Sequence, residues 1–130
     1  MTFVTRHRLP IFKDCALARI ACKAMTDPMV WQQSRLLAWV LMPDHWHGLI
    51  VLGDREALSA MVRRIKSNSS RCVRLERPEL GGVWARAFQD RALRHEEAVA
   101  TAARYVVQNP VRSGLVTSLS DYPYWNADWL

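Results

Sequence analysis

The sequence predicts an α+β fold, namely a ferredoxin-like antiparallel sheet with helices packed on it. Short β-prone runs and helical stretches follow one another in the order β, α, β, β, α, β, α at similar spacing, which is typical of such layered domains. The length of 130 residues suits a single domain over residues 1–130. With 50% hydrophobic and 23% charged residues, the composition is that of a globular protein and excludes a collagen-like, coiled-coil or wholly disordered chain.

The first half of the chain supplies the centre of the expected sheet. Its three β-prone runs cover residues 3–5, 36–42 and 45–52. The two longer runs are separated only by Pro43 and Asp44, a pair typical of a turn, so they are expected to be neighbouring strands. The alanine-rich stretch 14–25 predicts a helix, and Asp14 is placed to be its N-cap.

The second half supplies two more helices and one more strand. Residues that recur at helical spacing between positions 55 and 75 are Leu58, Met61, Val62, Ile65, Ser69 and Cys72. They predict an amphipathic helix whose inner stripe packs on the sheet. Residues 83–88 alternate as an edge strand does. A third helix over residues 96–108 must end before Pro110, because the residue preceding a proline is pushed out of the α region.

The charge balance favours a polyanionic partner. Eighteen Lys and Arg against twelve Asp and Glu give a formal net charge of +6, and fifteen of the eighteen basic residues are arginine. The planar guanidinium suits bidentate contacts to phosphate better than an ammonium does. Many basic domains bind no nucleic acid, so the positions of the charges have to decide.

Membrane and disulfide signals are weak. The longest apolar stretch, residues 36–42, is far short of the roughly 18 residues needed to span a bilayer. No apolar segment follows the basic residues near the start, so a cytoplasmic location is expected. Cys15, Cys22 and Cys72 form no CxxC pair, and reduced, partly buried thiols are expected in place of a disulfide scaffold or a zinc ribbon.

Two histidines in the predicted strand 45–52 are candidate metal ligands. His45 and His47 are separated by one residue, so their side chains lie on the same face of the strand with backbones about 6–7 Å apart. Two imidazoles in this arrangement can bind one metal ion. The alternative is a structural pair that holds no ion.

Tyr105 and Asn109 are four residues apart in the third helix and therefore neighbours on one helix face. A phenol beside an amide near a helix end is a candidate site. The alternative is that Tyr105 is a boundary residue with its hydroxyl in water and that Asn109 only ends the helix.

The remaining aromatic residues and histidines divide into three groups. Strand positions predict a core role for Trp39, Trp46 and Trp84. In the C-terminal tail, the residues that either stack on bases or pack over the site are Trp125 and Trp129. No paired spacing marks His7 or His95, which are expected to be surface or structural residues.

Three blocks of this sequence resemble the successive motifs of the REP-associated tyrosine transposases, relatives of the small single-tyrosine HUH insertion-sequence transposases. They are residues 42–51 (MPDHWHGLIV), residues 84–94, and residues 105–116 (YVVQNPVRSGLV). The resemblance covers nearly the whole chain. It implies a ferredoxin-like, RRM-like HUH nuclease domain that cuts and rejoins single-stranded DNA next to hairpins.

The resemblance also implies a role for each candidate residue. His45 and His47 match the paired metal ligands, Tyr105 matches the nucleophile, and Asn109 matches the polar residue that completes the metal site. The implied cofactor is Mg²⁺ or Mn²⁺, and two imidazoles favour Mn²⁺ over Mg²⁺, although they also accept Zn²⁺ or Ni²⁺. The implied product is a 5′-phosphotyrosine linkage, with a free 3′-OH on the other DNA fragment.

Basic residues are the candidate DNA contacts. On the amphipathic helix they are Arg63, Arg64, Lys66, Arg71 and Arg74, and their alternative role is a solvated helix face. Those near the motif blocks are Arg86, Arg91, Arg94, Arg104 and Arg112. A hairpin stem offers phosphates along an extended surface, which arginines can bind.

Two features depart from the family pattern. Few residues precede the first predicted strand, and Arg91 follows Asp90 where the family usually has histidine. The alternatives to a transposase are a non-catalytic module that binds hairpin DNA or RNA, and a metal-dependent hydrolase that uses water. Either a monomer or a homodimer is compatible with the sequence.

Overall fold

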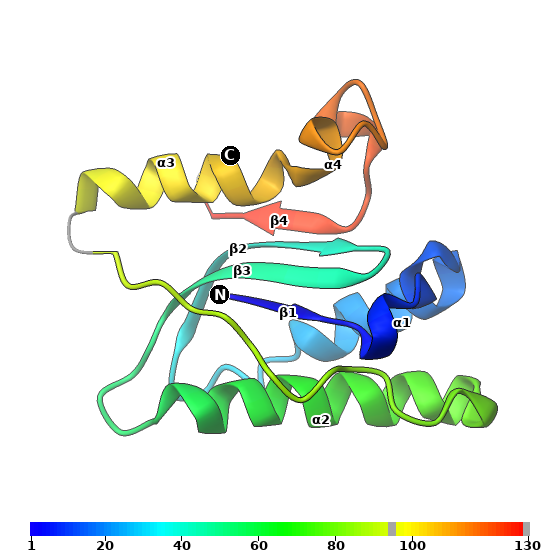
Figure 1. Cartoon of the computed structure of the whole chain (residues 1–130). Helices are drawn as coiled ribbons and strands as arrows, with labels where there is room; N and C mark the ends of the chain where they lie inside the picture. Colours follow the sequence, from blue (N-terminus) through cyan, green and yellow to red (C-terminus); the bar gives the residue numbers. More distant parts are fainter. Residues whose placement is uncertain (94–95, 129–130) are drawn as a thin grey trace.

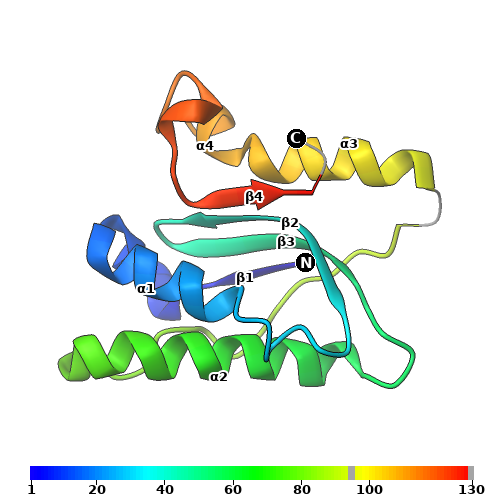
Figure 2. The ribbon, with the colours of Figure 1, turned by 180° about the vertical axis from the view of Figure 1, so that it is seen from behind.

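The computed structural model describes residues 1–93 and 96–128. A four-stranded antiparallel sheet has the strand order β1-β3-β2-β4. The strands are β1 (Thr2–Val4), β2 (Arg35–Met42), β3 (His45–Val51) and β4 (Trp125–Ala127). Helices cover both faces of this sheet (Figures 1 and 2). The predicted α+β class is therefore confirmed.

The helices are divided between the two faces. One face carries α1 (Cys15–Met25) and α2 (Leu58–Glu76), and the other carries α3 (Glu96–Val107) and the single-turn α4 (Asn109–Arg112). Four short 3₁₀ turns connect these elements: η1 (Arg6–Arg8), η2 (Ile11–Lys13), η3 (Pro78–Leu80) and η4 (Leu119–Asp121). Asp14 caps α1 as predicted, because its carboxylate accepts from the backbone N–H of Ala16 and Leu17 at 2.9 and 3.1 Å. The second helix begins at Leu58, three residues later than expected.

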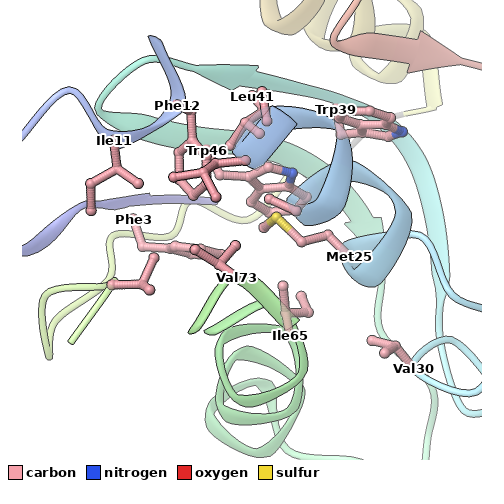
Figure 3. Close-up of a cluster of buried hydrophobic side chains, with 14 of the residues drawn as sticks. Phe3, Ile11, Phe12, Met25, Val30, Trp39, Leu41, Trp46, Ile65 and Val73 are labelled. Atoms are coloured by element: carbon pink, nitrogen blue, oxygen red, sulfur yellow. The ribbon is translucent and has the colours of Figure 1, made fainter. Parts of the chain in front are cut away.

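Alternation along β2 and β3 separates two hydrophobic cores. Trp39 and Leu41 of β2 and Trp46 of β3 are buried against α1 and α2 (Figure 3). The intervening residues Val40 and Met42 are buried on the other face against α3. Side chains at positions 45 and 47, which flank Trp46, therefore also lie on the α3 face.

The larger core is organised around Trp46, which is fully buried. The ring of Phe3 stacks on it at 5.1 Å between centroids, and Trp84 meets Phe3 edge-on at 4.8 Å. A Cβ at Gly48 would lie 2.1 Å from the Trp46 ring, so only glycine fits there. The predicted core roles of Trp39, Trp46 and Trp84 are confirmed, with Trp84 half-buried at the margin.

The predicted edge strand at residues 83–88 is wrong. This segment runs beside β1 but forms only two isolated bridges, Thr5 with Trp84 and Thr2 with Gln89. Two extra residues lie between these bridges, so the ladder bulges. Carbonyls in the bulge point to α2 and accept from the Lys66 ammonium, those of Ala85 at 2.8 Å and Ala87 at 3.0 Å.

The fourth strand comes from the C-terminal tail. In β4, Trp125 pairs with Val40 and Ala127 pairs with Ala38. Trp125 packs against the core beneath α3, so it is a packing residue there. Trp129 lies outside the described residues. Across the part of the chain that the structure describes, no helix is long and apolar enough to cross a membrane.

Candidate active site

His45 and His47 begin β3 on the face covered by α3 and α4. They lie opposite Met42 and Val40 in the β2–β3 register. Both imidazoles are partly buried, because the helices close over this end of the sheet. The strand thus presents both rings on the same face of the sheet, as the one-residue spacing predicted.

His45 is held between a carboxylate and an amide. Its Nδ1 lies 2.9 Å from Oδ1 of Asp44, and its Nε2 lies 3.3 Å from Nδ2 of Asn109. A carboxylate accepts hydrogen bonds, so Nδ1 carries the proton and donates to Asp44. The lone pair of Nε2 then points toward Asn109, where a metal ion could also be bound.

Asp44 is a site residue that the sequence analysis did not identify. Besides orienting His45, its Oδ2 lies 3.3 Å from Nε of Arg8, and its backbone carbonyl accepts from the N–H of Thr5 at 2.9 Å. His7 and Arg8 have positive φ angles of 56° and 55°, a strained conformation for non-glycine residues. This turn therefore fixes Asp44, and through it the ring of His45.

His47 is kept neutral by its surroundings. Burial, which is the largest cause, and the nearby α-amino group of Met1, the ring of His45 and the Arg112 guanidinium together lower its pKa to about 4. A neutral imidazole has a free lone pair at neutral pH, which a metal ligand requires.

The break before Pro110 aims two side chains at the site. Helix α3 ends at Val107, so the predicted break before Pro110 is confirmed, but Asn109 remains helical and begins α4 instead of lying in the third helix. From this single turn, Asn109 reaches His45. From the same turn, the Arg112 guanidinium lies 3.7 Å from the centroid of the Tyr105 ring, and its Nη1 donates to the Tyr105 carbonyl at 2.6 Å.

Tyr105 and His47 line one groove. Its volume is about 580 Å³, and it lies between β3, α3 and the segment 91–93. The Tyr105 side chain is accessible, since the residue is 60% exposed. The four residues singled out by the sequence are thus brought together: Asn109 contacts His45, and Tyr105 shares the groove with His47.

The donor set fits a divalent metal ion. Within residues 1–93 and 96–128, no three His, Cys, Asp or Glu side chains cluster as a metal site. The available ligands are the two imidazoles and the side-chain oxygen of Asn109, which would have to replace the Nδ2 that faces His45 in this structure. Neutral imidazole nitrogens and an amide oxygen together suit Mn²⁺ and also bind Mg²⁺.

The predicted basic residues differ in position and in exposure. Arg91 lines the groove, and Arg104 is exposed on α3. Exposed arginines away from the groove are Arg63, Arg71 and Arg74 on α2, across the sheet from α3, and Arg86 in the bulged segment. Arg94 and His95 lie outside the described residues.

Two of the predicted basic residues are engaged inside the protein. Arg64 pairs with the buried carboxylate of Glu56 and donates from Nε to the Val30 carbonyl at 3.0 Å. Lys66 donates to the bulged segment, as described above. Their cationic groups are committed to the fold, which the spacing of charges along a helix cannot reveal.

Comparison with known proteins identifies the family of this chain. The model of the family "Transposase IS200 like" matches residues 1–109. A REP-associated tyrosine transposase of Escherichia coli (strain K12) is 30% identical over 89 residues, covering 67% of this chain and 50% of that protein. An uncharacterized protein of Haemophilus influenzae is 24% identical over 106 residues, covering 65% and 58%.

Among solved structures, that of a REP-associated tyrosine transposase bound to a REP hairpin has the same fold. Its TM-score is 0.74 at 24% identity, with 95% of this chain and 72% of that chain covered. The chain spans about half the length of the curated relatives it matches. Since the family model extends over residues 1–109, which include the histidine pair, Tyr105 and Asn109, this chain belongs to the IS200-like transposase family.

Proposed function

We propose that this protein is a metal-dependent enzyme that nicks single-stranded DNA next to hairpins and transfers the cut strand. The observation that carries the proposal is the shared geometry of the four site residues. Tyr105 and His47 line one groove, while Asn109, one helical turn after Tyr105, lies 3.3 Å from Nε2 of His45. Family membership and a relative that binds a REP hairpin support the choice of reaction and substrate.

His45, His47 and Asn109 would hold the metal ion. Mg²⁺ or Mn²⁺ bound there supplies Lewis-acid chemistry, polarising a non-bridging phosphate oxygen and neutralising the charge that develops on it. Asp44 fixes the ring of His45 by accepting from Nδ1–H, so that Nε2 faces the site. The low pKa of His47 keeps its imidazole neutral for binding at neutral pH.

Tyr105 is the proposed nucleophile. Its Oη attacks the phosphorus in line, the new Oη–P bond forms, and the P–O3′ bond breaks. The phenol proton passes to water, and the departing 3′ oxygen takes up a proton. The DNA on the other side remains attached to Tyr105 through its 5′-phosphate, and the 3′-OH of another strand can reverse the step without an external energy source.

Arginines are proposed to hold the DNA backbone. Arg91 at the groove would contact the cut strand, and the exposed residues Arg63, Arg71, Arg74 and Arg86 would contact the hairpin stem. Arg112 is proposed to position Tyr105 and not to contact DNA, because its guanidinium already covers the Tyr105 ring. Arg64 and Lys66 are left out, since protein groups occupy their donors.

Covalent capture tests the proposal. The protein is mixed with Mn²⁺ and labelled hairpins that carry randomised single-stranded flanks, then denatured in SDS. Wild type and Tyr124→Phe should retain labelled DNA, whereas Tyr105→Phe and an EDTA-treated sample should not. Tight hairpin binding with no adduct would indicate a non-catalytic binding module. Cleavage that survives in Tyr105→Phe would indicate a hydrolase that uses water.

A further inference from the structure

The groove beside Tyr105 is more apolar than phosphate chemistry requires. The apolar residues that line it are Leu49, Leu93, Ala98, Ala102 and Val106. A metal ion and a phosphate need polar and charged partners. A lining of this kind is instead suited to a flat, poorly solvated group, and the volume of about 580 Å³ lies within the range of sites that bind small organic molecules.

The shape of the groove follows from residue choice along α3. Ala98 and Ala102 are four residues apart and so lie on one helix face, where their methyl groups leave space. Tyr105 continues that face by one more turn. The floor is Leu49, which lies two residues beyond His47 in β3 and is therefore on the same face of the sheet. Strand β3 and helix α3 form two sides of the groove, and the irregular segment 91–93 contributes Arg91 and Leu93 to its lining.

Charge at the groove complements a nucleotide. Arg91 is exposed and lines the groove, and Arg112 covers the Tyr105 ring. A second hollow of about 470 Å³ continues along β3 toward Val51. It shares Leu49, Arg91 and Leu93 with the first, and Asp90 also lines it. An apolar channel flanked by arginine matches a single strand, whose bases are apolar on their faces and whose backbone is anionic.

We propose that this groove binds the nucleobase of the unpaired nucleotide next to the phosphate that is cut, with Arg91 on the backbone of that strand. The inference rests on the proposed function and adds a base-binding site to it. The site would favour single-stranded over duplex DNA, since a paired base is stacked and cannot enter. Ala102 is the residue whose size decides whether the base fits.

A matched pair of substitutions tests the site. Ala102→Leu fills the groove, whereas Ala100→Leu makes the same change at an exposed position of the same helix. Each is made in a Tyr105→Phe background, so that no adduct forms and affinities are equilibrium values. The probe is a fluorescent hairpin with a flank of ten thymidines, compared with the same hairpin whose flank is abasic. Both probes carry the same phosphates, so only the bases differ.

The expected result is a preference for bases that depends on position 102. The background protein and Ala100→Leu should bind the thymidine flank roughly tenfold more tightly than the abasic flank, within the range measured for base contacts. Ala102→Leu should bind both probes equally, at the level of the abasic flank. Melting temperatures establish that both variants are folded.

Two results would overturn the inference. One is equal affinity of the background protein for the two flanks, and the other is a base preference that persists in Ala102→Leu. Because these comparisons need only binding, either result leaves the covalent-capture test of the proposed function unaffected. A background protein that binds neither hairpin would overturn both proposals together.

Discussion

Replacing Arg112 tests how α4 prepares Tyr105 for attack. The guanidinium lies 3.7 Å from the centre of the Tyr105 ring and donates to the Tyr105 carbonyl at 2.6 Å. Arg112→Met keeps an unbranched side chain of similar length but removes both interactions. The ring should then rotate more freely, so that fewer molecules hold Oη in position to attack.

The structure sets the size of the effect. An exposed cation–π contact contributes about 0.5–1 kcal/mol, and a hydrogen bond at the surface contributes about 0.5–1.5 kcal/mol. Losing about 1–2.5 kcal/mol of ordering predicts a roughly 5- to 70-fold slower rate of adduct formation under single-turnover conditions. Arg112→Lys retains the charge and should recover part of the rate. Arg104→Met removes an exposed arginine beside Tyr105 and serves as the control.

Binding measurements separate this role from a direct DNA contact. If Arg112 acts on Tyr105, the hairpin affinity of Arg112→Met and its salt dependence should equal those of wild type. A phosphate contact would instead weaken binding and lower the salt slope by about one. An unchanged adduct rate, or a loss explained by weaker binding alone, would refute the positioning role.

Three further outcomes are expected. Asp44→Asn should weaken Mn²⁺ binding about 10- to 100-fold by calorimetry, since the ring of His45 loses the carboxylate that orients it; an unchanged affinity would contradict this. Because the pKa of His47 is lowered to about 4, the unfolded chain binds more protons than the folded one below pH 6.5. The free energy of unfolding in urea should therefore fall as the pH drops from 6.5 toward 4, and it should fall less in His47→Gln. An equal fall in wild type and His47→Gln would contradict the burial of His47. Lys66→Met should lower the melting temperature by roughly 5–10 °C, because about 2 kcal/mol of hydrogen bonding is lost. The exposed control Arg63→Met should change the melting temperature little. Equal changes in the two variants would contradict a structural role for Lys66.

The sequence predicted the sheet's central hairpin and the spacing within the two residue pairs of the candidate site, because short-range rules determine both. Strand periodicity places His45 and His47 on one face. Helical periodicity places Asn109 one turn after Tyr105, and Pro110 ends the helix. These relations hold within a few residues and need no knowledge of the fold. That the two pairs meet follows from the packing of α3 on the sheet, which the family resemblance implied.

Features that depend on long-range partners were missed. The three residues of β4 are too few to show a period, and Trp125 is recognisable only by its pairing with Val40. Residues 83–88 alternate as a strand does, but Lys66, distant in sequence, draws their carbonyls away from β1. The role of Asp44 requires the turn at His7 and Arg8, whose backbone conformation no simple sequence pattern encodes.

Mapping the covalent adduct shows which residue attacks the DNA and which DNA end it holds. The hairpin flank carries one fluorophore on each side of the cut, and the protein–DNA product is digested with trypsin and nuclease before mass spectrometry. We expect a nucleotide 5′-phosphate on the peptide that contains Tyr105, and retention of the label on the 3′ side of the cut. A nucleotide on another residue, or the opposite label on the protein, would contradict the assignment of Tyr105 as the nucleophile that forms a 5′-phosphotyrosine.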